Sequence, residues 1–292
     1  MFMQKLHYRW SIKEMAKVLS VSQQGYYKWL HRTLTPYKHE DLLAMILKIR
    51  EEYQENENYG IGRIFLELQQ KYEFTGSLRT IYRVCKDNNL LIKRKRNPNG
   101  ITKADKEAQK SENIIKQDFT AETPNTKWLS DVTEVACSDG KLYVSAVFDC
   151  YDGAVLGLSM DDNMRKELCI SSFESACKRY NAYGMIFHSD RGSQYTSGLF
   201  RESLTKNGAI QSMSGTGRCY DNARMESFFA TLKKEKLYKI KTELLSIETV
   251  KTIIFRYIEV YYNRNRIYTT NEKGYPPLVY RNMYYKNLQL AA

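Results

Sequence analysis

The sequence predicts an α/β protein in which a mixed sheet flanked by helices follows an all-α N-terminal region. Up to about residue 92, apolar residues recur at helical spacing, and from Pro124 the period changes to two over three successive segments. Beyond these segments helical and strand-like patterns alternate, which is typical of a sheet covered by helices on both faces.

Composition narrows the class of partner. The 292 residues are 42% hydrophobic, enough for a real core, and carry a formal charge of +12, which favours a nucleic acid over a membrane surface. The six cysteines form no Cys-x-x-Cys pair, and the N-terminus lacks a signal-like apolar run, so reduced thiols are expected. No apolar run approaches the roughly 20 residues that span a bilayer. We therefore expect a soluble, cytoplasmic protein with no membrane partner.

Residues 1–38 are predicted to be a helix-turn-helix-like segment. The inner face of a first helix is indicated by Ile12, Met15, Ala16 and Leu19, and that of a second by Tyr26, Trp29 and Leu30. Ser22 can cap the second helix. Such a unit can lay its second helix in a DNA groove, although an ordinary helical hairpin fits the pattern equally well.

Residues 39–92 are predicted to be a helical domain of a DNA-binding type. Ser77 can cap its last helix, which we expect to reach Leu91. The arginines Arg63, Arg79 and Arg83 are predicted to lie on a helical surface suited to phosphates; a solvated face is the alternative. Residues 93–123 are polar and charged and are predicted to be a basic linker or a tethering helix. Its run Lys93–Arg96 fits a DNA backbone and a solvated linker equally well.

Residues 124–240 are predicted to be the catalytic core. Three antiparallel strands at 127–136, 141–148 and 154–160 are separated by turn residues. A helix at 165–180, a strand starting at Met185, a helix at 197–207, a short strand near Ile210 and a helix carrying Glu226 follow. This order matches the ribonuclease H-like fold. Residues 241–292 are expected to form a C-terminal helical tail.

Three carboxylates stand out in this core. Asp190 follows a short apolar strand and precedes a turn at Gly192, and Asp131 lies mid-strand on the same face as Leu129. Glu226 lies at the edge of an apolar helical stripe formed by Met225, Phe228, Phe229 and Leu232. Asp221 and Asn222 precede this helix and are predicted to cap it.

This set of side chains favours a hard divalent cation, because the carboxylates come without a cysteine or histidine cluster. Two Mg²⁺ or Mn²⁺ ions roughly 3.5–4 Å apart could activate an attacking oxygen and stabilise a leaving one. Lys233, two helical turns after Glu226, could hold a DNA phosphate, or it is a solvated helix lysine. His188 is interpreted as a residue that packs or supports the neighbouring Asp190; a direct role in the chemistry is the alternative.

The sequence resembles the second-frame catalytic protein of bacterial insertion sequences with two reading frames, a class of Asp-Asp-Glu transposases related to retroviral integrases. The matching residues are Trp128-x-x-Asp131-x-Thr133, His188-Ser189-Asp190-Arg191-Gly192-Ser193-Gln194-Tyr195, and Tyr220-Asp221-Asn222-Ala223 leading to Glu226-Ser227-Phe228. Lys233, Glu235 and the run Tyr261–Arg266 continue the match. The resemblance covers essentially the whole chain.

The resemblance implies that Asp131, Asp190 and Glu226 bind the metal. It implies hydrolysis at the element ends to free a 3′ hydroxyl, followed by attack of that hydroxyl on a phosphodiester, without a covalent protein–DNA intermediate. The implied partners are double-stranded DNA, as element ends and target, and further copies of the chain in a homo-oligomer on paired ends. It also allows for a first-frame partner or fusion.

Two positions depart from the family pattern. Tyr268 stands where the family usually has histidine, and Pro276-Pro277 where it has Ser-Pro, which puts C-terminal packing in question. Two other functions remain open at this point. A ribonuclease H-type nuclease would cut without joining, and a non-catalytic DNA-binding regulator would use residues 1–92.

Overall fold

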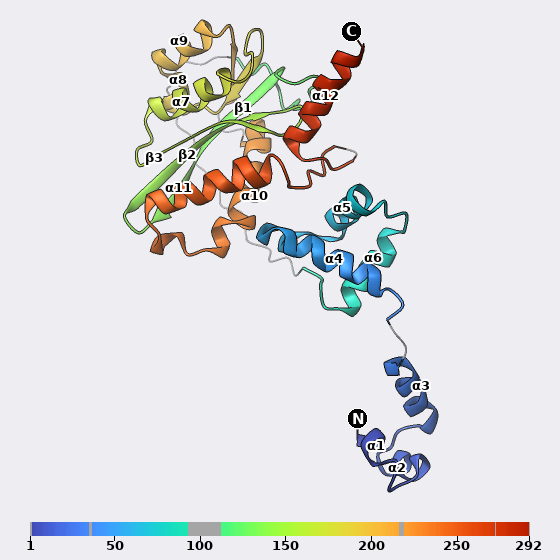
Figure 1. Ribbon diagram of the computed structural model, residues 1–292. Helices are drawn as coiled ribbons and strands as arrows, with labels where there is room; N and C mark the ends of the chain where they lie inside the picture. The colour runs from blue at the N-terminus through green and yellow to red at the C-terminus, as the bar shows by residue number, and fades with distance from the viewer. Residues whose placement is uncertain (1, 35–36, 93–111, 216–218, 272, 292) are drawn as a thin grey trace.

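The computed structural model describes residues 2–34, 37–92, 112–215, 219–271 and 273–291, and the chain runs from small helical units into a sheet covered by helices (Figure 1). None of the helices in these ranges is long and apolar enough to cross a membrane. The cysteines whose side chains are described are all free thiols.

The N-terminal helices form a small unit with a core of their own. They are α1 (Phe2–Leu6), α2 (Ile12–Val18) and α3 (Gln23–Leu34). Met15, Ala16 and Tyr26 are buried between them, and the Ser22 hydroxyl accepts a hydrogen bond from the Gly25 N–H at 2.9 Å, as an N-cap does. The prediction for Leu19 was wrong: this side chain is 43% exposed. The reason is that α2 ends at Val18 and Ser20 turns the chain with φ 53°.

Residues 40–87 form a three-helix unit. It comprises α4 (Glu40–Glu52), the 3-10 turn η1 (Gln54–Asn58), α5 (Ile61–Tyr72) and α6 (Leu78–Asp87). The Ser77 hydroxyl accepts a hydrogen bond from the Thr80 N–H at 3.3 Å, which confirms the predicted cap. α6 ends at Asp87 rather than Leu91, because Asn89 adopts a left-handed conformation with φ 57°.

The sheet has five strands in the order β3-β2-β1-β4-β5. They are β1 (Lys127–Cys137), β2 (Gly140–Asp149), β3 (Val155–Asp161), β4 (Ile186–Ser189) and β5 (Ile210–Met213). The first three pair antiparallel, and β4 and β5 add in parallel beside β1. The predicted meander followed by alternating helices and strands is therefore confirmed.

Helices cover both faces of the sheet (Figure 1). On one face α7 (Lys166–Cys177), α8 (Ser193–Thr196) and α9 (Gly198–Lys206) bury a cluster that includes Trp128, Phe173 and Phe187. On the other face the elements are η2 (Cys219–Asn222), α10 (Ala223–Glu235), η3 (Leu237–Lys239), η4 (Thr242–Leu244), α11 (Ile247–Phe255) and the π-helical segment η5 (Arg256–Tyr262). Their core joins Leu129 to Phe228 and also reaches the three-helix unit.

The predicted linker 93–123 is described only in part, since residues 93–111 and their basic run lie outside the described residues. Residues 112–123 lie against the sheet: the Met213 N–H donates to the Glu112 carbonyl at 3.2 Å, and Ile115 is buried. The division of the chain into five segments stays a prediction.

The C-terminal helix α12 (Pro277–Ala291) is tied to the sheet by one buried arginine. Arg281 donates to the carboxylates of Asp152, at 2.6 Å, and Asp149. Pro277 is the first helical residue, where its missing N–H costs nothing. The departure from the family pattern at Pro276-Pro277 is thus compatible with a packed helix.

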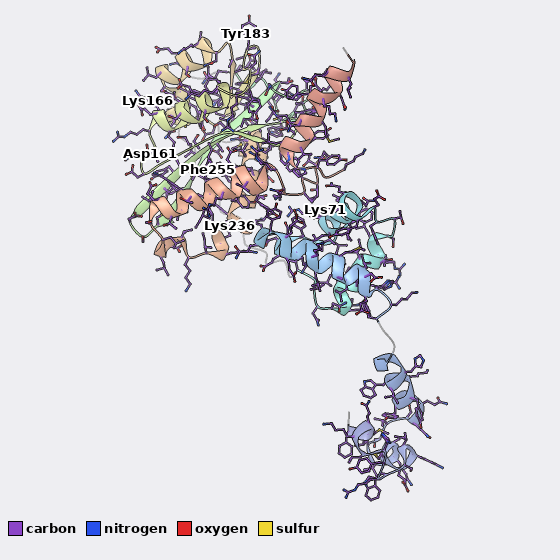
Figure 2. The ribbon with its side chains drawn as sticks, viewed as in Figure 1. Lys71, Asp161, Lys166, Tyr183, Lys236 and Phe255 are labelled. Carbon is purple, nitrogen blue, oxygen red and sulfur yellow. The ribbon has the colours of Figure 1, made fainter. Side chains whose placement is uncertain are left out.

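The three-helix unit is also fastened to the core. The Lys236 ammonium, just beyond α10, lies 2.7 Å from a Glu55 oxygen, and Lys236 is labelled at this junction in Figure 2. The Tyr261 hydroxyl donates to Asn56 at 2.9 Å. Polar bonds of this kind, together with the shared apolar core, fix the unit relative to the sheet.

Candidate active site

Two of the three predicted carboxylates follow from strand register. Leu129 of β1 pairs with His188 of β4 in parallel. Asp131 lies two residues further along β1, and Asp190 lies two residues after His188, directly beyond the end of β4. Because side chains two residues apart share a face, both carboxylates lie on the face of the sheet that carries Leu129. The parallel addition of β4 beside β1 therefore brings Asp131 and Asp190 next to each other.

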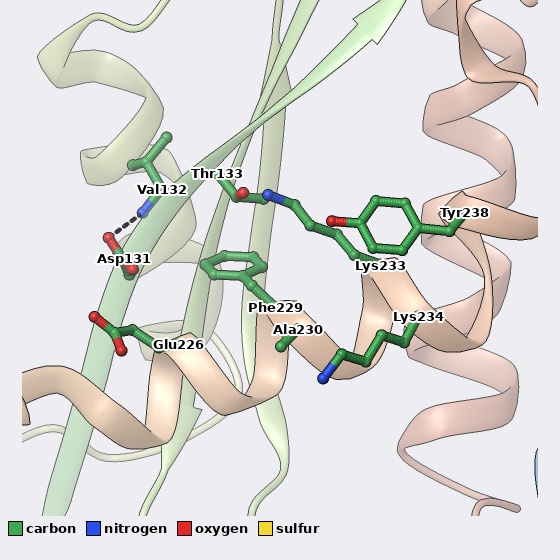
Figure 3. A pocket seen from close by; sticks show the side chains of 9 residues that line it. All are labelled: Asp131, Val132, Thr133, Glu226, Phe229, Ala230, Lys233, Lys234 and Tyr238. Carbon is green, nitrogen blue, oxygen red and sulfur yellow. Dashed lines mark hydrogen bonds between the residues drawn. The ribbon is translucent and has the colours of Figure 1, made fainter. Parts of the chain in front are cut away.

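The third carboxylate is placed by the packing of α10. Met225, Phe228, Phe229 and Leu232 are buried against the sheet, as the helical stripe predicted. Glu226 and Lys233, beside this stripe, remain at its edge. Figure 3 shows the carboxylates of Asp131 and Glu226 facing one space between β1 and α10, with Lys233 extending toward Thr133. This pocket is lined by Asp131, Val132, Thr133, Glu226, Phe229, Ala230, Lys233, Lys234 and Tyr238.

The surroundings of Asp131 disfavour the charged form of its carboxyl group. The pKa of its carboxyl is raised to about 7, chiefly by burial and also by the charges of Asp190 and Glu226, while the Val132 N–H bond and the Lys233 charge oppose the rise. The Val132 N–H donates to this carboxylate at 2.8 Å. Asp190 is exposed to solvent on one side, but the protein around its carboxyl group raises the pKa of this residue as well. The Gly192 N–H donates to the carboxylate at 3.0 Å, which lowers the pKa and so opposes the rise.

The three carboxylates are neighbours without forming a closed ligand cage. Asp190 acts on Asp131 electrostatically but does not line the pocket that Asp131 shares with Glu226. Within the described ranges, no three His, Cys, Asp or Glu side chains are close enough together to hold one ion. The metal-binding roles of Asp131, Asp190 and Glu226 therefore stay a prediction, as does DNA contact by Lys233.

His188 supports the strand that carries Asp190. Its imidazole is fully buried, with Nδ1 2.8 Å from the Ser212 hydroxyl and Nε2 3.2 Å from the Ser214 hydroxyl. Burial lowers the pKa of this imidazole to about 4, so the ring is neutral near pH 7. This environment confirms the interpretation of His188 as a packing residue.

The prediction that Asp221 and Asn222 cap α10 is right for the position of Asn222 but wrong for Asp221 and for the capping hydrogen bond. Asn222 occupies the cap position, but its side chain makes no cap hydrogen bond and instead donates to the Ser130 carbonyl at 3.2 Å. The buried Asp221 carboxylate accepts hydrogen bonds from Asn113 at 2.8 Å, from Gln117 at 2.9 Å and from the Gly215 N–H at 2.7 Å. Both side chains therefore hold the start of α10 to other segments.

Other residues at the site were not singled out from the sequence. Lys234 and Tyr238 line the pocket, and helical spacing from Glu226 and Lys233 could have indicated Lys234. The Tyr268 hydroxyl accepts a hydrogen bond from Arg224 at 3.1 Å. Arg224 lies two residues before Glu226, so the departure from the family pattern at position 268 supports α10 rather than loosening it.

Known proteins with similar sequences share this core. Residues 121–219 and 226–285 both match the integrase core domain. Transposase InsF for insertion sequence IS3A of Escherichia coli is 33% identical over 273 residues, which cover 91% of this chain and 92% of that protein. The insertion element IS600 uncharacterized 31 kDa protein of Shigella sonnei is 34% identical over 256 residues, which cover 86% of this chain and 92% of that protein. These matches confirm the predicted integrase-type, ribonuclease H-like core.

Solved structures that are similar to parts of the chain include two from retroviruses. The HTLV-2 integrase catalytic core domain in complex with magnesium is 20% identical with a TM-score of 0.40, over 55% of this chain and 98% of that chain. The simian T-cell lymphotropic virus intasome in complex with PP2A regulatory subunit B56 gamma is 13% identical with a TM-score of 0.46, over 73% of this chain and 72% of that chain.

Proposed function

The chain belongs to the family of insertion-sequence transposases that includes InsF, and from this premise we propose that Asp131, Asp190 and Glu226 carry its metal-dependent DNA chemistry. The observation that carries the proposal is that Asp131 and Glu226 line one pocket, with Asp190 near enough that its charge helps to raise the pKa of Asp131. Carboxylates that repel one another at the edge of a cleft are typical of a site for a divalent cation.

The donor set fits Mg²⁺ or Mn²⁺, because all three candidate ligands supply carboxylate oxygens. Two such ions, when bound, supply Lewis-acid activation of the attacking oxygen and stabilisation of the leaving oxygen in phosphodiester displacement. The reaction proposed is hydrolysis at the element ends, which frees a 3′ hydroxyl, followed by attack of that hydroxyl on a target phosphodiester.

The chain's own residues would position the DNA and the carboxylates. Lys233 lines the pocket beside Glu226, where its ammonium could pair with a phosphate next to the scissile bond. The neutral His188 fixes the end of β4 through Ser212 and Ser214. Asn222 holds the start of α10 against Ser130, the residue before Asp131.

The partners that we propose are double-stranded DNA, as element ends and target, and further copies of the chain assembled on paired ends. A first-frame partner or fusion belongs to the same proposal. Support comes from family membership and from the formal charge of +12.

The proposal is tested by cleavage of labelled DNA that carries the ends of the element encoding the chain. Asp131→Asn, Asp190→Asn and Glu226→Gln should each reduce metal-dependent cleavage by roughly a thousandfold or more, as expected when a group acts only in the transition state. Asp161→Asn is the matched control, because Asp161 ends β3 at the far edge of the sheet. Equal cleavage by the three variants and the wild type would refute the assignment.

A further inference from the structure

Within residues 40–92, three of the four basic side chains that form no ion pair or side-chain hydrogen bond lie on the outer face of α6. Arg79, Tyr82, Arg83 and Lys86 are all exposed and recur at i, i+3, i+4 and i+7, so they form one stripe along the helix. The opposite face carries the buried Ile81, Val84 and Cys85. In the described part of the chain, Arg79, Arg83 and Lys86 take part in no ion pair or side-chain hydrogen bond.

Within the three-helix unit, no other helix carries such a group of cations. Residues 40–92 contain nine acidic and seven basic residues, so the three-helix unit as a whole is not basic. Three of the seven cations serve the fold: Arg50 donates to the Leu90 carbonyl, Arg63 pairs with Glu235 at 2.8 Å, and Lys71 pairs with Glu67 at 2.7 Å. Of the remaining four, Lys48 lies on α4 and the other three lie on the stripe. A surface that only contacts solvent would not require the cations without a partner to lie together on one helix.

Packing against neighbouring helices and a fixed turn hold α6 in place as the second helix of a helix-turn-helix. Its inner face packs against α4 and α5 in the buried core, and Figure 1 shows it beside these helices and apart from the sheet. The turn from α5 is fixed by Glu73 in a left-handed conformation with φ 51°, by Phe74 packed edge-on against Phe65, and by the Ser77 cap.

We propose that α6 binds in the major groove of double-stranded DNA through Arg79, Arg83 and Lys86, with Tyr82 packed against the sugar–phosphate edge. From Arg79 to Lys86 the stripe spans roughly 10 Å of helix axis. That length fits a major groove roughly 12 Å wide. The choice of DNA as partner rests on the proposed function.

The Arg63–Glu235 and Glu55–Lys236 ion pairs fasten this unit to the C-terminal end of α10, so DNA held on α6 would keep a fixed position relative to Asp131 and Glu226. The stripe would therefore set which stretch of DNA lies at the pocket, a role separate from the phosphate contact proposed for Lys233.

The test is fluorescence anisotropy of the full chain with a labelled duplex of mixed sequence, about three helical turns long, measured in EDTA between about 50 and 200 mM salt. Arg79→Gln combined with Arg83→Gln should raise Kd by roughly tenfold or more and reduce the slope of log Kd against log salt by about 2. Arg79→Lys combined with Arg83→Lys should retain most of the slope, because the charges remain.

The matched control is Arg201→Gln combined with Lys206→Gln, which removes the same charge from the exposed side of α9. Equal weakening in this control, or an unchanged Kd and slope in the α6 variant, overturns the proposal. The proposal is also overturned if the α6 variant loses affinity only for single-stranded DNA and not for the duplex. Failure of the wild type to bind the duplex overturns it as well. Binding in EDTA needs no chemistry, so failed cleavage by the wild type would count against the proposed function and leave this result intact.

Discussion

The buried carboxylate of Asp221 shows how one residue can join three segments around the site. It accepts hydrogen bonds from Asn113, Gln117 and the Gly215 N–H, and the next residue, Asn222, bonds β1 beside Asp131. The segment at 112–117 and the approach to α10 are therefore held by a side chain that the sequence indicated only as a helix cap.

We expect Asp221→Asn to loosen this junction. In the variant, the amide NH₂ group of the new asparagine replaces one carboxylate oxygen and faces an N–H donor. The loss of one buried acceptor costs roughly 1–3 kcal/mol. Hydrogen exchange should accelerate at residues 112–117, and the free energy of unfolding should fall by a similar amount in denaturant titration. Asp87→Asn, at the exposed end of α6, is the control and should change neither. Unaltered exchange at 112–117 would contradict the role given to Asp221.

Residue-level prediction succeeded where local pattern determines position. A period of two places Asp131 on the face of Leu129, and helical spacing places Glu226 beside the buried Phe228 and Phe229. It failed for Asp221, because its partners Asn113 and Gln117 lie more than a hundred residues upstream and only the folded sheet brings them near. The prediction for Leu19 was wrong for a local reason, because the helix ends one residue before the apolar pattern does.

At the scale of elements, the strands of the meander were predicted to within a residue or two. Alternation and the turn residues between the strands define their ends. The π-helical segment Arg256–Tyr262 was not predicted. It buries Tyr257, Ile258, Tyr261 and Tyr262, a face wider than a regular α-helical stripe, and the propensities of these residues do not distinguish a π turn from an α-helix.

The C-terminal end of α10 is the element that joins the site to the rest of the protein. Its last residue, Glu235, is buried and accepts hydrogen bonds from Arg266 at 2.8 and 2.9 Å, from Arg63 at 2.8 Å and from the Tyr257 hydroxyl at 2.9 Å. Burial raises the pKa of this carboxyl, but the hydrogen bonds and charges of Arg266 and Arg63 outweigh that effect and lower it to about 2.

Glu235 should therefore make the stability of the fold sensitive to acid. The folded pKa of about 2 lies below the ordinary value of 4.5, so the stabilisation is complete above pH 4.5 and is lost as pH falls toward 2. At pH 7 we expect Glu235→Gln to lower the free energy of unfolding by about 3 kcal/mol. In urea titrations the difference from wild type should shrink below pH 4.5.

The control for this prediction is Glu202→Gln on the exposed face of α9, which should stay within about 0.5 kcal/mol of wild type at every pH. A difference between Glu235→Gln and wild type that is constant from pH 7 to pH 2 would show that the carboxylate charge is not what stabilises this junction.

At the scale of the whole molecule, the pocket, α10 and the three-helix unit form one connected body. Arg63 and Lys236 join α5 and η1 to the end of α10, and Arg281 joins α12 to Asp149 at the end of β2 and to Asp152 in the turn that follows. The C-terminal segment is thus part of the core's packing, which agrees with the integrase core match that extends to residue 285. The sequence predicted a helical tail, but it could not show that Arg281 is buried, because both its partners lie more than a hundred residues away.

The measurement that tests the central claim most directly is joining of a pre-cleaved element end, with its 3′ hydroxyl exposed, to a labelled target duplex. In Mg²⁺ or Mn²⁺ the wild type should form joined strands, whereas Asp190→Asn should form none while binding the same DNA with unchanged affinity. Removal of the metal with EDTA should also abolish joining. Joined product from Asp190→Asn, or joining that persists in EDTA, would contradict a metal-dependent strand transfer by Asp131, Asp190 and Glu226. Nicked target without joining would indicate a nuclease instead.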